Sequence, residues 1–182
     1  MVSQQEYTPP SIVQLLGVIA LILVVSVYGL ISLNTGDLLW FWPKFDAEPA
    51  GMMIHCYGRD VKLEPGTVPF SDITALVNQG LSGAKRWDPL SLSDTTYDEY
   101  QHSPRMMTLE VFYEPPVRIH SQYKFFSDVD TLVVPLDGRH ARYRVVFGRA
   151  RGITGPGSFP METAPLIAEY LNKEGLCVKP DR

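Results

Sequence analysis

A run of 23 residues without a charged side chain, residues 11–33, is the feature that most restricts how this chain can fold. The run holds a single amide, Gln14. A helix of this length reaches roughly 34 Å, which is enough to cross a hydrocarbon core of about 30 Å. A buried core helix is the alternative, but core helices are rarely this long and apolar on every face. The sequence therefore predicts one transmembrane helix over residues 11–33.

The residues around this run indicate an uncleaved anchor rather than a cleaved signal peptide. Residues 1–10 form a short polar tail without lysine or arginine, and the apolar run is longer than the core of a typical signal peptide. Residues 34–47 form an aromatic linker after the run. In it, Trp40, Phe41 and Trp42 are amphipathic rings of the kind found where a membrane meets water. We expect these three side chains to contact the lipid bilayer.

Two arguments about membrane orientation oppose each other. Lys44, offset by Asp37 and Asp46, slightly favours a cytoplasmic C-terminal domain under the positive-inside rule. Single N-terminal anchors in bacterial-type proteins, in contrast, usually export the domain that follows them. We expect a single-pass membrane protein with its domain on the extracytoplasmic side.

The charged residues belong almost entirely to the rest of the chain. All 16 basic residues and 19 of the 20 acidic residues lie from Asp37 onward, and the net charge of −4 argues against a nucleic-acid-binding protein. Proline and glycine separate short apolar runs in this region. The pattern predicts one α+β domain over residues 48–182, mainly antiparallel β, with two or three short helices.

A β-hairpin at residues 137–138 is the clearest local prediction. Asp-Gly between two β-prone runs is typical of a two-residue turn, which would place Leu132 opposite Tyr143. One face of the two strands would then be apolar. The other face, with Arg142 and Arg144, would be basic and exposed to water.

Other elements follow from the spacing of apolar residues and from capping residues. Strands are expected over residues 51–57, 106–113 and 117–121. One helix is expected to begin near residue 71 and to end at Gly80. A second helix is expected to begin after Thr163 and to end at Gly175 in a Schellman-type stop. Residues 83–104 lack a clear period, and we expect an extended loop there.

An excess of arginine is the most unusual charge pattern. Residues 139–161 contain five arginines and no acid. The candidate binding residues are Arg118, Arg139, Arg142, Arg144, Arg149 and Arg151. Three interpretations remain open: a solvated strand face paired with acids such as Glu110 and Glu114, a surface for a partner or for lipid headgroups, and a pocket for a small anion. Neither a P-loop nor a dinucleotide-binding glycine pattern is present.

The histidines and cysteines carry no recognisable catalytic signature. The spacing of the four histidines predicts no metal site, and we expect no cofactor: His55, His102, His120 and His140. A hydrolase pairing such as Cys56 with His120 is not required by the sequence. Cys56 and Cys177 are the only cysteines. They are a candidate disulfide in an oxidising compartment, or two free thiols in a reducing one.

Two classes of function follow from these observations. The anchor, the lack of a catalytic signature and the arginines favour a non-enzymatic interaction or accessory module at the membrane surface, with a membrane-protein partner or complex. The alternatives are a membrane-tethered hydrolase and a binding domain for an anionic ligand. A pocket that gathers a histidine with an acid or Cys56 would favour the hydrolase. Convergence of Arg142, Arg144 and Arg149 on one cavity would favour anion binding.

Overall fold

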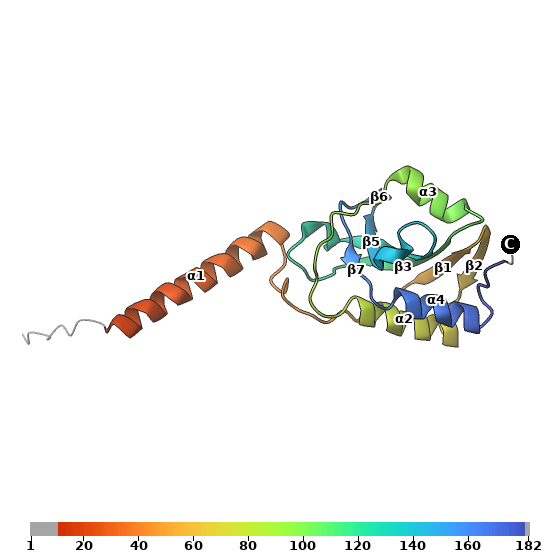
Figure 1. The fold of residues 1–182 in the computed structure, drawn as a ribbon. Helices are drawn as coiled ribbons and strands as arrows, with labels where there is room; N and C mark the ends of the chain where they lie inside the picture. Colours follow the sequence, from red (N-terminus) through yellow and green to blue (C-terminus); the bar gives the residue numbers. More distant parts are fainter. Residues whose placement is uncertain (1–10, 181–182) are drawn as a thin grey trace, which may run out of the picture.

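The computed structural model describes residues 11–180 and has an N-terminal apolar helix followed by one α+β domain (Figure 1). Helix α1 (Ile12–Thr35) is long and apolar enough to serve as a membrane span or as a signal sequence. It begins at a capping box, in which the Ser11 hydroxyl accepts from the Gln14 amide and the Gln14 side chain accepts from the Ser11 amide. The expected polar tail over residues 1–10 lies outside the described residues.

A seven-stranded antiparallel sheet forms the centre of the domain. The strand order is β2-β1-β3-β4-β5-β6, and β7 pairs with β5. The strands are β1 (Gly51–Cys56), β2 (Arg59–Leu63), β3 (Met107–Val117), β4 (Val129–Asp137), β5 (Val145–Ala150), β6 (Ile153–Thr154) and β7 (Phe159–Pro160). The expected fold class, a mainly antiparallel α+β domain after an apolar helix, is confirmed.

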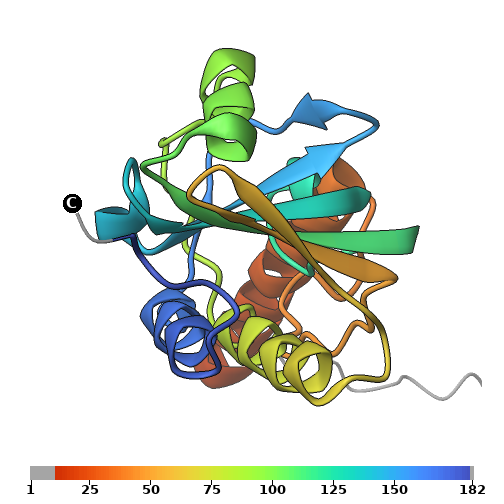
Figure 2. The same ribbon diagram turned by 90° about the vertical axis from the view of Figure 1, so that its right-hand side faces the viewer.

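Helices cover both faces of the sheet, as the end-on view in Figure 2 shows. Helices α2 (Val68–Gly80) and α4 (Ala164–Lys173) lie side by side on one face, and α3 (Asp94–His102) lies on the other. The main core lies between the sheet and the α2/α4 pair and includes Ile54, Leu109 and Leu132. The opposite face holds a smaller cluster that includes Val133 and Phe147.

The β4–β5 hairpin forms, but its expected turn and register are wrong. Leu132 lies opposite Gly148 rather than Tyr143, and the connection contains a short 3-10 helix, η2 (Ala141–Tyr143). Because the register differs by an odd number of residues, the side chains of β5 exchange faces, and Phe147 packs with Val133. Both strand faces are buried because both are covered by helices.

The prediction of a basic strand face exposed to water is therefore also wrong. Arg142 lies within η2 and Arg144 directly follows it, so neither belongs to a strand. Burial of Val145 and Phe147 beside Leu92 outweighs the local preference for a two-residue turn. The consequence is that these arginines project from a loop instead of lining the sheet.

Helix α3 lies within residues 83–104, where a loop is expected from the sequence. Ser93 caps it, because its hydroxyl accepts a hydrogen bond from the Thr96 amide at 3.2 Å. The side chains that α3 buries, Thr96 and Tyr100, carry hydroxyl groups that contact Arg139 at 3.2 Å and His140 at 2.5 Å, respectively. An apolar stripe, the usual signal of such a helix, is therefore missing.

Helix α4 begins after Thr163 as expected, whereas the expected start of α2 near residue 71 is wrong. Helix α4 ends as expected, with the Leu176 amide donating to the Leu171 carbonyl at 3.0 Å and the Gly175 amide to the Asn172 carbonyl at 3.1 Å. Helix α2 begins at Val68, earlier than expected, because a proline suited to a first helical turn follows Val68 directly.

The proline pair at residues 115–116 does not end β3, which continues to Val117. Its pairing with β4 is interrupted instead, with a register shift between Phe112 and Val117. The separate strand expected over residues 117–121 is thus wrong beyond Val117. The prolines lack the amide protons that a regular ladder requires, which accounts for the shift.

Candidate functional site

The junction between α1 and the domain is held by contacts between residues far apart in the sequence. The buried carboxylate of Asp37 accepts from the Leu39 amide at 2.8 Å and lies 2.9 Å from Nδ1 of His120. The Arg118 guanidinium donates to the Gly36 carbonyl at 2.7 Å. The end of α1 is therefore packed against the domain, and residues 34–47 do not act as a free tether.

The three aromatic residues expected at the membrane lie directly after this junction. Phe41 and Trp42 are about half exposed, and Phe41 packs against Tyr28 of α1 with ring centroids 6.3 Å apart. Trp40 meets Phe41 edge to face at 5.7 Å. The three aromatic residues therefore lie at the point where α1 meets the domain.

The six candidate arginines do not gather at one place. Three of them form ion pairs at the surface: Arg139 with Glu99 at 2.8 Å, Arg144 with Glu162 at 3.1 Å, and Arg151 with Asp128 at 3.2 Å. Arg118 belongs to the α1 junction. Surface pairs of this kind contribute little to stability, so they position the side chains more than they stabilise the fold.

Arg149 is buried beneath α3, unlike the other arginines. Its guanidinium carbon lies 3.4 Å from the centroid of the Tyr97 ring, and it donates to the Gly152 carbonyl at 2.6 Å. The cavity beside the η2 turn is lined by Arg139 and Arg142, but not by Arg144 or Arg149. The convergence expected of an anion-binding domain is therefore absent from this cavity.

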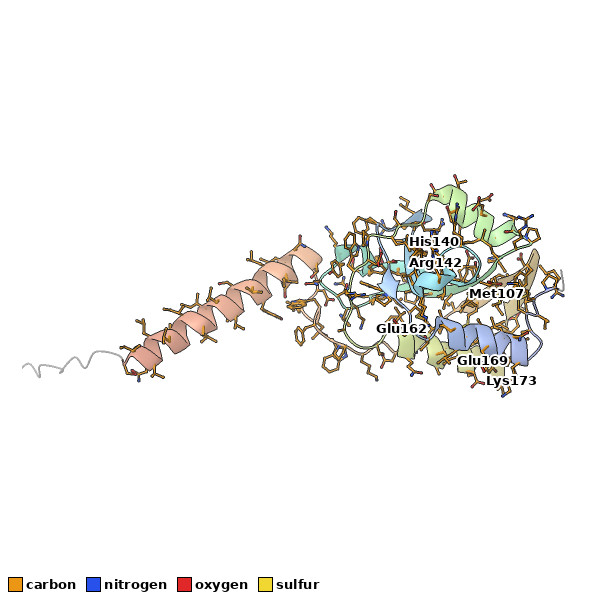
Figure 3. All side chains as sticks on the ribbon, viewed as in Figure 1. Met107, His140, Arg142, Glu162, Glu169 and Lys173 are labelled. Carbon is orange, nitrogen blue, oxygen red and sulfur yellow. A yellow bond between two sulfur atoms is a disulfide. The ribbon has the colours of Figure 1, made fainter. Side chains whose placement is uncertain are left out.

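Residues 138–144, here called the arginine loop, form an exposed projection of the domain. Figure 3 shows His140 and Arg142 over the middle of the domain, away from α1. Arg142 is exposed, and its guanidinium carbon lies 4.6 Å from the centroid of the Tyr143 ring. Among residues 11–180, no carboxylate lies within ion-pair distance of this guanidinium. It is the arginine of the loop that is free to meet an outside carboxylate.

The backbone of the arginine loop is held in an unusual conformation. His140 and Arg144 have φ of +65° and +49°, values that non-glycine residues rarely adopt. Nδ1 of His140 lies 2.5 Å from the Tyr100 hydroxyl, which anchors the loop to α3. Burial, together with Arg139 and Arg142, lowers the pKa of His140, so its ring is neutral near pH 7. The positive φ values of His140 and Arg144 are strained, and strain of this kind persists only where the surrounding structure enforces it.

A buried polar cluster lies between α3 and the sheet. Nδ1 of His55 lies 2.8 Å from the Asp60 carboxylate, and its Nε2 lies 3.4 Å from the Glu110 carboxylate. Gln101 of α3 donates to Glu110 at 3.4 Å and to the Tyr97 hydroxyl at 2.9 Å. No pattern in the sequence pairs His55 with Glu110. The alternation of side chains along a strand could assign His55 and Glu110 each to one face of its own strand. No local sequence pattern, however, shows that β1 and β3 are neighbours in the sheet.

The two central groups of this cluster stabilise each other in their charged forms. Burial by itself lowers the pKa of His55, but contacts with Glu110 and Asp60 outweigh it and raise that pKa. Burial by itself raises the pKa of Glu110, but contacts with His55 and Tyr97 lower it below its usual range. The side chains of His55 and Glu110 are only 8% and 3% exposed, so a substrate does not reach them in this conformation.

Cys56 faces the opposite side of the sheet from His55 and forms a disulfide with Cys177. The two Cα atoms lie 5.6 Å apart, and the bond ties the segment after α4 to β1. While this bond is intact, Cys56 cannot act as a nucleophile with His120 as its general base. Among residues 11–180, no group of three or more His, Cys, Asp or Glu side chains is placed to hold a metal ion.

Comparison with known proteins adds no name to this geometry. No protein-family model, no curated protein and no solved structure matches the chain.

Proposed function

We propose that the chain is a membrane-anchored, non-enzymatic interaction module that presents the arginine loop to an acidic segment of a membrane-protein partner. The observation that carries this proposal is the α1 junction. The contacts of Asp37 with His120 and of Arg118 with Gly36 leave the domain little freedom to rotate on its anchor. A partner in the same membrane would therefore meet the loop at a constant height and direction.

The chemistry of the arginine loop supports a protein partner. Arg142 and Tyr143 belong to the residue types that dominate binding energy at interfaces, and both are exposed. A guanidinium without an internal carboxylate is suited to bidentate pairing with an Asp or Glu of another chain. The contact of His140 with the Tyr100 hydroxyl at 2.5 Å holds the loop against α3, which reduces the ordering cost of binding.

The disulfide supports an extracytoplasmic position for the domain. Bonds such as Cys56–Cys177 persist in oxidising compartments and are rare where thiols are kept reduced. On this proposal the domain faces the outside of the membrane. Protease treatment of intact cells or right-side-out vesicles should then digest the domain, and protection from external protease would contradict this orientation.

Charge reversal at Arg142 tests the role of the loop. The full chain, as wild type and as Arg142→Glu, is cross-linked in its own membrane. It is then extracted and purified in mild detergent. Arg105→Glu is the matched control, since Arg105 is also exposed and has no carboxylate partner in the described chain. We expect the same cross-linked partner with wild type and Arg105→Glu, and a loss of at least about tenfold with Arg142→Glu. Equal yield from all three proteins would overturn the proposal.

A further inference from the structure

Two cavities share the rings of Trp40 and Phe41 as a common wall. The first, called the apolar groove, has a volume of about 400 Å³ and is otherwise lined by Leu23, Val24, Val27 and Tyr28 of α1. The Tyr28 hydroxyl is occupied, because it donates to the Leu38 carbonyl at 3.1 Å. The groove therefore offers carbon surface to a ligand.

The second cavity, called the polar cavity, has a volume of about 350 Å³ and is lined in part by Lys85, His120 and Gln122. Nζ of Lys85 donates to the carbonyls of Pro43 at 2.8 Å and Gly83 at 3.0 Å, which leaves one of its three hydrogens free. Among residues 11–180, no carboxylate lies within ion-pair distance of this ammonium group. The polar cavity thus contains a positive charge without an internal counter-ion.

His120 adds a second nitrogen to the polar cavity. Its Nδ1 donates to Asp37, so Nε2 is left as an acceptor that can meet a hydroxyl group of a ligand headgroup. The carboxylate of Asp37, which contacts His120, has its two oxygens engaged by the Leu39 amide and by His120. The negative charge nearest the cavity is therefore directed into the protein.

The position of the two cavities along α1 matches the layers of a membrane. At about 1.5 Å per residue, the 24 residues of α1 span roughly 36 Å, somewhat more than a hydrocarbon core of about 30 Å. The end of α1 at Thr35 then lies in the headgroup layer, together with Trp40 and Lys85. The groove residues Leu23–Val27 lie about two to three turns earlier, within the hydrocarbon.

We propose that the two cavities together bind one phospholipid, with an acyl chain in the apolar groove and the phosphate at Lys85. The phosphodiester supplies the negative charge that Lys85 lacks, and charge-assisted hydrogen bonds to phosphate are among the strong ones. The indole ring of Trp40 contacts the region between phosphate and chain, a place that amphipathic rings favour, and the Phe41 ring adds apolar surface beside it. This inference rests on membrane insertion of α1, but not on the partner role of the arginine loop.

Native mass spectrometry of the full chain tests the site. The protein is equilibrated in detergent micelles with phosphatidylglycerol, or with diacylglycerol of the same chains, which lacks the phosphate. We expect one phosphatidylglycerol per chain on the wild type and at least about tenfold weaker retention of diacylglycerol, since each tenfold corresponds to about 1.4 kcal/mol. Equal retention of the two lipids would overturn the role of Lys85.

Two variants address the two halves of the site separately. Lys85→Gln removes the charge, and Val27→Trp fills the groove; each should reduce phosphatidylglycerol retention at least about tenfold. Lys124→Gln, an exposed lysine outside the polar cavity, and Val25→Trp, on a part of α1 that does not line the groove, are the matched controls and should retain the lipid. Equal retention by all five proteins would overturn the proposal.

Inorganic phosphate distinguishes a lipid site from a simple anion site. We expect millimolar phosphate to leave the lipid bound, because the acyl chain contributes part of the affinity. Displacement of the lipid by phosphate, unaffected by Val27→Trp, would show an anion site and overturn the role of the groove. Cross-linking of the partner through Arg142 is a separate readout, so loss of the lipid site would leave the proposed function standing.

Discussion

The imidazole of His55 on β1 lies 3.4 Å from the buried carboxylate of Glu110 on β3. The pair joins two neighbouring strands on the face covered by α3, where apolar side chains would be the usual choice. Removing one member of a buried ion pair leaves the other charged and unpaired, which costs several kcal/mol. The pair therefore makes the attachment of α3 dependent on protonation.

Stability should vary with pH through this pair. The pKa of His55 is raised, so its contribution is complete below the ordinary value of 6.5 and is lost as the pH rises through the folded-state pKa. The pKa of Glu110 is lowered, so its contribution is complete above the ordinary value of 4.5 and is lost as the pH falls through the folded-state pKa. We expect the unfolding free energy to be highest at mildly acidic pH, measured by urea denaturation of the full chain in detergent.

A substitution separates this effect from general acid sensitivity. Glu110→Gln should lower the unfolding free energy by roughly 3 kcal/mol and remove the loss of stability at low pH that Glu110 causes. The loss at high pH should become smaller but persist, because His55 keeps Asp60 as a partner at 2.8 Å. Asp98→Asn is the control, because Asp98 lies at the same 3.4 Å from a histidine, His102, but both side chains are exposed. It should leave the pH profile unchanged. An unaltered profile in Glu110→Gln would show that another group controls it.

Removal of the disulfide should lower stability strongly. Cys56 and Cys177 are separated by 121 residues, and a cross-link that closes a loop of about 100 residues contributes roughly 4–5 kcal/mol in the chain-entropy model. The double variant Cys56→Ser/Cys177→Ser should melt at a lower temperature than the wild type. Reductant should bring the wild type to the same melting temperature and leave the double variant unaffected. A wild-type melting temperature that reductant does not change would contradict the prediction.

Gly157 should tolerate no side chain, in contrast to Gly152. A Cβ at Gly157 would lie 2.0 Å from Nε1 of Trp87 and 2.7 Å from the Asp88 carbonyl oxygen, whereas a Cβ at Gly152 would meet open space. Both residues have left-handed φ, so Gly152→Ala measures the backbone cost alone, about 1–2 kcal/mol. Gly157→Ala should cost clearly more in urea denaturation and should change Trp87 fluorescence. Equal costs would mean that the Trp87 side chain moves aside freely.

Asp37 should control the mobility of the α1 junction. Asp37→Ala removes the acceptor of the Leu39 amide and the partner of His120, so hydrogen exchange over residues 38–42 should become at least about tenfold faster. Asp46→Ala, which removes an exposed partner of Lys44, should exchange like the wild type. Measurement in nanodiscs keeps α1 in its lipid environment. Identical exchange in both variants would show that the junction is held by other contacts.

The features that could be predicted from the sequence depend on residues close together in the chain. The apolar composition of α1 and the Thr163 and Gly175 ends of α4 are local properties, and the structure contains them. The register of β4 with β5 was not predictable from the Asp-Gly turn, because burial of Phe147 under the α3 face decided it. Helix α3 has no apolar stripe, since it covers polar side chains.

The candidate sites show the same limit. Five arginines lie close together over residues 139–151, and the hairpin prediction placed Arg142 and Arg144 on one basic face. Their partners, such as Glu99 and Glu162, come from other elements and disperse these arginines. The His55–Glu110 pair and the contact of Asp37 with His120 join residues 55 and 83 positions apart. Only the order of strands and the docking of α1 bring such residues together, and no local pattern reports either.

The disulfide also determines how a mechanical load would travel through the molecule. Helix α1 leaves one end of the domain, and the segment after α4 lies at the other end (Figure 1). Tension between α1 and a point beyond Cys177 would pass along residues 36–56 and then directly through the sulfur–sulfur bond. Residues 57–176 would carry none of it through the backbone. The arginine loop would thus keep its shape under a pull that loads β1.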